Sequence, residues 1–154
     1  MNYDIIGDIH GHADELESLL TTLGYRNTYG AWRHANRTAL FVGDLIDRGP
    51  RQVDTVRMVR AMVDAGSARC IMGNHEFNAI AWHTADPELP GEYLRQHGRP
   101  GNRQQHARFL ADVEGTALHD ELIDWFKTLP LWLDLGQLRI VHACWNEAYI
   151  VGAD

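Results

Sequence analysis

The sequence predicts a layered α/β fold whose sheet is mixed rather than purely parallel. In the first half of the chain, short apolar segments alternate with segments that have the apolar periodicity of helices, which is typical of layered α/β domains. Three of the apolar segments end in a glycine that is followed at once by aspartate or asparagine. The chain has no internal repeat, and its 154 residues suffice for one domain with a hydrophobic core.

The first half contains three predicted strands and three predicted helices. The expected strands are residues 3–7, 38–43 and 68–73. The expected helices are residues 13–23, 53–65 and 75–82. Gly24 and Gly66 follow the first two helical patterns directly, where glycine commonly ends a helix. Between the first helix and the second strand, residues 25–34 are expected to form an irregular hairpin or loop.

The second half begins with a segment that is rich in proline and glycine. Residues 84–103 contain too many of these residues for a long regular element, so we expect a lid, a binding loop or a disordered segment there. Two helices are expected next, and Pro130 ends the second of them. A strand pair joined by a tight turn completes the pattern. These elements are residues 104–113, 118–129, 131–135 and 138–141.

Composition excludes several classes of protein. The formal net charge of −7 argues against a duplex nucleic-acid binder, which needs a basic face for phosphates. No apolar run approaches the roughly 20 residues that cross a bilayer. The chain begins with Met1 and runs straight into a predicted strand, without the pattern of a signal peptide. Two cysteines make a disulfide framework implausible, so a cytoplasmic location is expected.

Oxygen and imidazole ligands follow four of the predicted strands. They are Asp8, His10, Asp44, Asn74 and His142. Strands of an open α/β sheet present ligand-binding residues at their carboxyl ends, so we expect these side chains to meet. The mixture suits divalent manganese, iron or zinc, with manganese preferred, and is too rich in histidine for calcium. The alternative is that these residues are loop caps and turn residues and that His142 is a core histidine. That alternative would leave clustered carboxylates without a cation.

The stretch from Asp44 to Gly49 adds groups that suit phosphoryl chemistry. Asp44 has two usable oxygens and could bridge two ions that share a hydroxide, which is a strong nucleophile at neutral pH. Arg48 could grip phosphate oxygens, the alternative being an ion pair with Asp44 or Asp47. His75 could protonate a leaving group while Asp47 holds its other nitrogen. Glu76 could orient a ligand, or could simply be an acidic residue in the first turn of a helix.

Four ordered motifs now suggest a family. The sequences GDIHG at residues 7–11, GDLIDRG at 43–49, GNHE at 73–76 and VHA at 141–143 resemble the calcineurin-like metallophosphoesterases. More narrowly, they are similar to the branch that contains serine/threonine phosphoprotein phosphatases and bacterial diadenosine tetraphosphatases. The Asp-Arg-Gly after the second aspartate is typical of that branch. The resemblance implies a metallophosphoesterase-type β-sandwich flanked by helices, with two divalent metal ions.

The resemblance also implies a role for each matching residue. The first metal would be held by Asp8, His10 and Asp44, and the second by Asp44, Asn74 and His142. The catalytic roles described above would fall to Asp47, Arg48 and His75. The family normally supplies one more metal-binding histidine from a later Gly-His motif, which this chain lacks. We therefore expect residues 1–154 to be the N-terminal portion of a longer catalytic domain, with a fold that is incomplete at the C-terminus.

The function expected from the sequence is metal-dependent hydrolysis of a phosphate ester or anhydride. The substrate would be a dinucleoside polyphosphate or a phosphoprotein, and the bacterial Val-His-Ala sequence favours the nucleotide. Trp82 and Trp145 are candidates for stacking on a nucleobase, and His83, His97 and His106 are expected to be mostly exposed. One alternative is a catalytically silent metal-binding interaction module, and another is a phosphatase for nucleic-acid ends, which the acidic charge disfavours. Nucleic acid and membrane are thus not expected partners, and the oligomeric state stays open.

Overall fold

The computed structural model describes residues 2–150, except for the side chain of Tyr149. Its strands are β1 (Asn2–Ile6), β2 (Arg26–Thr28), β3 (Ala31–Arg33), β4 (Arg37–Phe41), β5 (Ala68–Cys70), β6 (Trp132–Asp134) and β7 (Arg139–Val141). Its helices are α1 (Ala13–Thr22), α2 (Gln52–Asp64), α3 (Asn74–His83), α4 (Asn102–Val113), α5 (Ala117–Lys127) and α6 (Glu147–Ile150). The predicted elements are therefore confirmed, with shifts of a few residues at their ends.

The central sheet has three strands in the order β1–β4–β5, and both pairs are parallel. The expectation of a mixed sheet is therefore wrong for the part of the chain that the structure describes. The antiparallel pairs β2–β3 and β6–β7 form separate two-stranded sheets. Both crossovers within the central sheet pass through a helix, as parallel neighbours require. All three carboxyl ends consequently open on the same edge.

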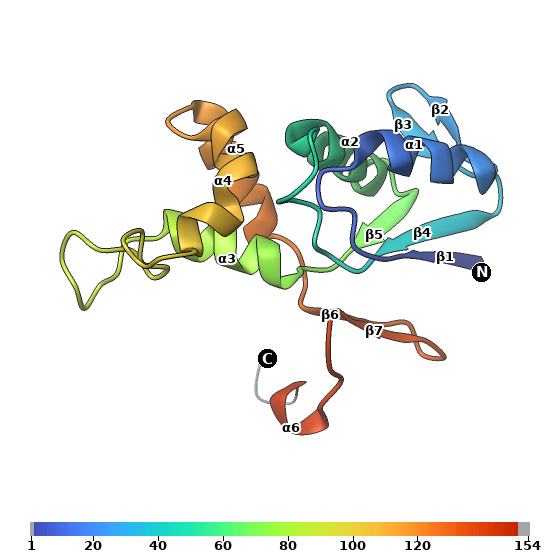
Figure 1. Cartoon of the computed structure of the whole chain (residues 1–154). Coiled ribbons are helices and arrows are strands. Elements are labelled where there is room, and N and C mark those ends of the chain that lie inside the picture. Colours follow the sequence, from blue (N-terminus) through green and yellow to red (C-terminus); the bar gives the residue numbers. More distant parts are fainter. Residues whose placement is uncertain (1, 151–154) are drawn as a thin grey trace.

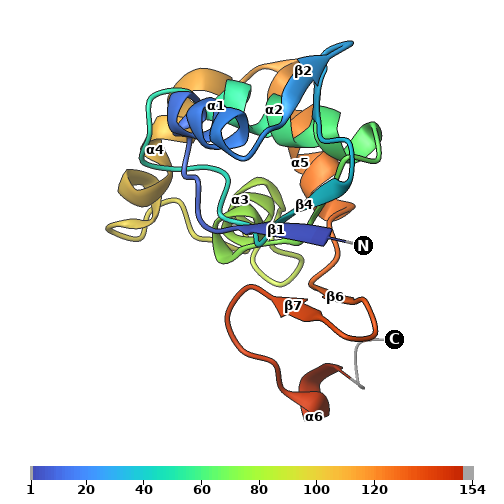
Figure 2. The same cartoon turned by 90° about the vertical axis from the view of Figure 1, so that its right-hand side faces the viewer.

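Two layers cover the two faces of this sheet (Figure 1). Helices α1 and α2 lie over one face, where Phe41 and Ala39 of β4 belong to the main core. The hairpin β6–β7 lies over the other face, where Leu40 packs with Ile71 and Ile140. Alternate residues of a strand point to opposite faces, so β4 contributes to both cores. The hairpin thus supplies the second layer of strands expected of a sandwich, and α6 lies beyond it (Figure 2).

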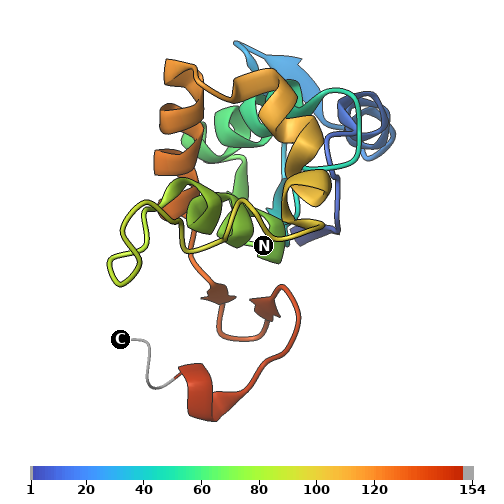
Figure 3. The ribbon, with the colours of Figure 1, turned by 60° about the vertical axis from the view of Figure 1, so that its left-hand side comes forward.

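Helices α3, α4 and α5 form a second group beside the sheet, and the segment between α3 and α4 runs along α3 (Figure 3). This segment has no helix and only one isolated bridge, between Ala85 and Tyr93, so the predicted loop is confirmed. The loop is bound to α3. The ring of His97 stacks between Trp82 and Tyr93 at centroid distances of 3.8 and 4.0 Å, and its Nε2 donates to the carbonyl of Trp82.

The buried His119 of α5 should make the folded chain less stable at acidic pH. Burial, followed by the nearby His83, lowers its pKa to about 4 from a reference value of 6.5. Above pH 6.5 the ring is neutral whether the chain is folded or unfolded. As the pH falls from 6.5 towards 4, the unfolded chain takes up a proton that the folded chain does not. The free energy of unfolding should therefore fall by about 3 kcal/mol over this range.

Urea unfolding of the chain and of its His119→Leu variant, at pH 7.5 and pH 4.5, would measure this contribution. The difference in free energy of unfolding between the two pH values should be smaller in the variant by about 2 to 3 kcal/mol. Equal pH dependence in both proteins would contradict the prediction.

Among residues 2–150, none of the helices combines the length and the apolar character needed to cross a membrane.

Candidate metal centre

The loops after β1 and β4 are hydrogen-bonded to each other directly beyond the sheet edge. The amides of Ile9 and His10 both donate to the carbonyl of Asp44, at 3.0 and 2.9 Å. The amide of Gly11 donates to Leu45 at 2.7 Å, and that of Gly49 donates to His10 at 2.7 Å. These contacts hold Asp8, His10 and Asp44 in one place, as the strand-end pattern predicts.

The backbone at this position has an unusual conformation. Four non-glycine residues have positive φ: His10 at 49°, Asp44 at 56°, Asp47 at 65° and Arg48 at 95°. Each such residue costs on the order of 1 kcal/mol or more and persists only where its surroundings enforce it. Strain concentrated on four candidate functional residues indicates that their positions serve the site rather than stability.

Glu76 enforces part of this geometry from α3. Its buried carboxylate accepts from the amides of Asp44 and Leu45, both at 2.8 Å, and from Gly73 at 3.0 Å. Burial raises the pKa of Glu76, although the three amides act in the opposite direction. Both interpretations of Glu76 therefore hold: it lies in the first turn of α3, which it caps through Gly73, and it orients a ligand, Asp44, through the backbone.

The first group of possible ligands consists of Asp8, His10 and Asp44. The Nδ1 of His10 donates to the carbonyl of Ile46 at 2.7 Å, so a neutral ring has its lone pair on Nε2. That buried atom has no hydrogen-bond partner within the described residues. It lies 3.7 Å from Asp8 Oδ2 and 3.8 Å from Asp44 Oδ2. Nε2 of His10 thus lies near an oxygen of each carboxylate, and Asp44 also belongs to both sets of three ligand atoms that lie within 4.8 Å of one another.

The second group consists of Asp44, Asn74 and His142. The Nδ1 of His142 donates to the carbonyl of Val42 at 2.7 Å, so Nε2 again carries the lone pair of a neutral ring. This Nε2 lies 2.9 Å from Asn74 Oδ1 and 3.5 Å from Asp44 Oδ1. Acceptors this close repel each other unless a proton or a metal ion lies between them. Asp44 thus turns one oxygen to each group, which is the arrangement of a bridging ligand.

Other groupings of the same atoms are also possible. Asp8 lies near enough to Asp44 and His142 to share an ion with them, and His75 lies near enough to His10 and Asp44. Asp44 is common to every grouping. Neither Asp8 nor Asp44 forms an ion pair with lysine or arginine among residues 2–150, so their negative charge is not balanced by the protein side chains there.

A second cluster begins at His75, which follows Asn74 at the start of α3. The Nδ1 of His75 donates to Asp47 Oδ2 at 2.7 Å, and its Nε2 lies 3.9 Å from Asp44 Oδ2. The hydrogen bond to Asp47 raises the pKa of His75 against the effect of burial. Burial raises the pKa of Asp47, but hydrogen bonds from His106 and His75 outweigh it, and this pKa lies below its usual value. His75 and Asp47 therefore have the predicted pairing.

Arg48 is exposed and forms no ion pair with Asp44 or Asp47. The structural alternative considered for Arg48 is thus wrong, and its guanidinium remains available to an anion. Gln52 of α2 supports the preceding loop, since its Oε1 accepts from the amide of Asp47 and its Nε2 donates to the carbonyl of Gly49, both at 2.6 Å. Gln52 is not part of any of the sequence motifs that predict the site.

His106 is a further functional residue outside the predicted set, and the expectation that it is exposed is wrong. His106 is buried and donates from Nδ1 to Asp47 Oδ1 at 2.8 Å. Its spacing from Phe109, Leu110 and Val113 of α4 is the signal that could have placed it on the buried face of this helix.

The structure places the two tryptophans that were candidates for stacking on a nucleobase in different environments. Trp82 is 2% exposed and cannot stack on a base, so that expectation is wrong. Its position on the buried face of α3, with Ala79, explains the error. Trp145 is half-buried beside the guanidinium of Arg139, and its role stays a prediction.

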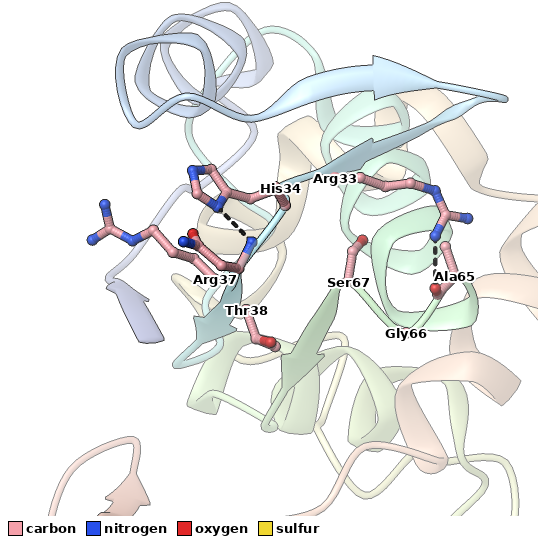
Figure 4. Close-up of a pocket in the computed structure, with 9 residues that line it drawn as sticks. Arg33, His34, Arg37, Thr38, Ala65, Gly66 and Ser67 are labelled. Atoms are coloured by element: carbon pink, nitrogen blue, oxygen red, sulfur yellow. Dashed lines mark hydrogen bonds between the residues drawn. The ribbon is translucent and has the colours of Figure 1, made fainter. Parts of the chain in front are cut away.

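A cavity of about 370 Å³ lies at the opposite end of the sheet, at the amino ends of β4 and β5 (Figure 4). The two arginines that line it already have partners within the chain. Arg33 donates to the carbonyl of Ala65 at 3.0 Å, and Arg37 pairs with Asp4. This cavity is therefore separate from the candidate metal centre.

Comparison with known proteins agrees with the geometry. The family model described as calcineurin-like phosphoesterase matches residues 1–147. The asymmetrical bis(5'-nucleosyl)-tetraphosphatase PrpE of Bacillus subtilis is 32% identical over 146 residues, which cover 93% of this chain and 57% of that protein. The symmetrical bis(5'-nucleosyl)-tetraphosphatase of Ralstonia nicotianae is 32% identical over 138 residues, covering 90% of this chain and 40% of that protein.

Solved structures show a similar fold. The cold-active protein-tyrosine phosphatase of a psychrophilic Shewanella has a TM-score of 0.59 and 20% identity, covering 98% of this chain and 46% of that one. A metallophosphoesterase from Sphaerobacter thermophilus has a TM-score of 0.57 and 21% identity, covering 90% of this chain and 45% of that one. The chain spans about half the length of the curated relatives it matches.

Proposed function

The chain belongs to the calcineurin-like phosphoesterase family, and from this premise we propose that it is a metal-dependent hydrolase of phosphate esters or anhydrides. One observation carries the proposal. Two histidines commit Nδ1 to backbone carbonyls and direct Nε2 towards opposite oxygens of Asp44. Such a convergence of electron-pair donors is costly unless cations neutralise it.

We propose that Asp8, His10 and Asp44 hold one divalent ion and that Asp44, Asn74 and His142 hold a second. Manganese is the preferred ion, and iron or zinc would suit the same ligands. Bound ions of this kind lower the pKa of a water and neutralise charge on phosphoryl oxygens. The carboxylate of Asp44 turns an oxygen to each group, and Glu76 keeps this loop in place through backbone amides.

The remaining residues would act on the substrate directly. The guanidinium of Arg48 is exposed and forms no ion pair among residues 2–150, so it can bind phosphate oxygens with two parallel hydrogen bonds. His75 can donate a proton from Nε2 to the leaving oxygen, because its Nδ1 is held by Asp47. The raised pKa of His75 favours the protonated form that a general acid needs.

A dinucleoside polyphosphate is the proposed substrate class, supported by the names of the relatives. The exposed side of α3 offers a surface for a nucleobase. Phe77 is 60% exposed and lies three residues after Asn74, which is also exposed, so both share one side of the helix. An exposed phenylalanine beside a phosphate site can stack on a base.

Replacing Phe77 by alanine should therefore weaken nucleotide binding selectively. We expect the KM for diadenosine tetraphosphate to rise about 5- to 30-fold, which corresponds to roughly 1 to 2 kcal/mol of stacking. The KM for p-nitrophenyl phosphate, which has no base, should change less than twofold. Leu131→Ala, at an exposed apolar residue away from Phe77, is the matched control. An equal rise for both substrates would contradict the stacking role.

Hydrolysis by the chain itself tests the function. The metal-free protein would be supplied with Mn²⁺ and either diadenosine tetraphosphate, p-nitrophenyl phosphate or a phosphoserine peptide. Mn²⁺-dependent release of product, fastest from the dinucleotide, is the expected result. Faster hydrolysis of the peptide would instead favour a phosphoprotein substrate. No hydrolysis of any of them, with Mn²⁺ still bound, would favour the catalytically silent binding module.

We also propose that residues 1–154 are part of a longer catalytic domain and that the protein works in the cytoplasm. The first proposal is supported by relatives of which the matched part of the chain covers only 55% and 57%. The second is supported by two cysteines, Cys70 and Cys144, that are both free thiols.

A further inference from the structure

We propose that His106 is a positioning residue for the hydrolytic reaction, which it serves by holding Asp47 and, through Asp47, His75. The inference rests on the proposed function, because it concerns the residue to which that function assigns the proton of the leaving group. His106 lies on α4 and follows Asp47 by 59 residues in the sequence. No strand-end motif contains it.

The three side chains form a continuous buried chain of hydrogen bonds. Nδ1 of His106 donates to Asp47 Oδ1 at 2.8 Å, and Nδ1 of His75 donates to Asp47 Oδ2 at 2.7 Å. All three residues are at most 4% exposed. Each oxygen of the carboxylate therefore accepts from a different imidazole, and the plane of the carboxylate is fixed by two bonds rather than one.

The ring of His106 is itself fixed in place. It packs against Phe109 at a centroid distance of 5.0 Å and lies 6.0 Å from Trp82. Trp82 belongs to α3, the helix that carries His75. The ring of His106 thus fits between α4 and α3, and it cannot turn without disturbing both packing contacts.

Stability alone does not explain a histidine at this position. Nε2 of His106 is buried and has no hydrogen-bond partner within the described residues. A buried polar nitrogen without a partner costs about 1 to 3 kcal/mol. An apolar side chain would avoid this cost on a helix face that otherwise presents Phe109, Leu110 and Val113. The bond to Asp47 is the contact of His106 that offsets this cost.

The consequence for His75 is geometric. With Asp47 held from both sides, Nδ1 of His75 keeps its hydrogen and Nε2 stays directed towards Asp44 Oδ2, 3.9 Å away. Nε2 is then the atom from which a proton can pass to a leaving oxygen. Without His106, Asp47 keeps one bond and can rotate, so His75 spends less time in the productive orientation. Loss of such an orienting contact typically costs 10- to 100-fold in activity.

Steady-state kinetics of His106→Leu would measure this effect. We expect kcat to fall about 10- to 100-fold and KM to change less than threefold. The loss should be larger with phenyl phosphate than with p-nitrophenyl phosphate, because the more basic phenolate needs a proton and p-nitrophenolate does not. His106→Asn should restore much of kcat, since its amide nitrogen lies where Nδ1 was, and His106→Gln should not.

His119→Leu is the matched control. His119 is also a buried histidine with an unpartnered Nε2, but none of its described contacts reaches Asp47. It should leave kcat and the dependence on the leaving group unchanged. A purely structural role for His106 would instead give activity losses that follow thermal stability across the Leu, Asn and Gln variants. Equal losses for both phosphate esters would also overturn the proposal.

A second measurement does not need an active chain. In ¹⁵N-histidine NMR of the metal-free protein, recorded at a pH high enough to leave the His75 ring neutral, His75 should appear with its hydrogen on Nδ1, assigned by its loss in His75→Gln. In His106→Leu this signal should shift or divide between the two tautomers, whereas in His119→Leu it should not change. An unchanged His75 signal in His106→Leu would overturn the positioning role. This result is independent of hydrolysis, so failure of the proposed function would be recognised separately.

Discussion

Replacing Asp44 by asparagine is expected to reduce hydrolysis by at least about 1,000-fold, or about 4 kcal/mol. Asp44 is 4% exposed and faces His10 with one oxygen and His142 with the other. An amide in its place removes a negative charge and turns one of these two atoms into a donor, which cannot bind a cation. Both groups of ligands should be damaged by one substitution. Isothermal titration with Mn²⁺, beside hydrolysis of p-nitrophenyl phosphate, would measure both effects.

Asp112→Asn is the control for this experiment. It makes the same chemical change on the exposed side of α4, and it should leave metal binding and hydrolysis unchanged. Circular dichroism would establish that both variants are folded. If Asp44→Asn bound Mn²⁺ with the stoichiometry and affinity of the original chain, the bridging role proposed for Asp44 would be wrong.

Replacing Gly43 by alanine should strongly destabilise the fold. Gly43 has a φ of +91°, and a Cβ added there would lie 2.2 Å from the backbone nitrogen of Gly73 and 2.5 Å from its Cα. Neither contact can be relieved by a side-chain rotation, so the loops after β4 and β5 would have to separate. Separation would also break the hydrogen bonds of Glu76 to Asp44 and Gly73. We expect a loss of roughly 4 kcal/mol or more in the free energy of unfolding.

Gly91→Ala distinguishes close packing from backbone strain. Its φ of +88° is nearly the same, but nothing lies within 4 Å of the added Cβ. It should cost only about 1 kcal/mol, the price of a left-handed alanine. Urea denaturation of both variants gives the comparison. Similar losses for the two would mean that the approach of Gly43 to Gly73 contributes little.

The sequence alone was sufficient to predict the elements and the residues at the ends of the strands. Apolar periodicity defined the helices, because a buried face recurs every three to four residues whatever the helix packs against. Glycine followed by a ligand residue, repeated after three strands, indicated a shared edge, because parallel strands end on the same side of a sheet. These are local signals or consequences of strand direction.

Other features depended on packing between distant segments. The central sheet is purely parallel because the antiparallel hairpins form sheets of their own, and local patterns do not state which strands pair. Trp82 is buried because the loop that carries His97 folds back on α3.

His106 shows this limit most clearly. Its contact with Asp47 joins residues 59 positions apart. It arises because α4 packs against α2, which follows the loop that carries Asp47, and no periodicity in either segment specifies that contact. The sequence by itself thus determined which chemical groups gather at the sheet edge, because the strand ends carry them there. Only the tertiary structure decided which group supports Asp47, because that depends on how separate helices pack.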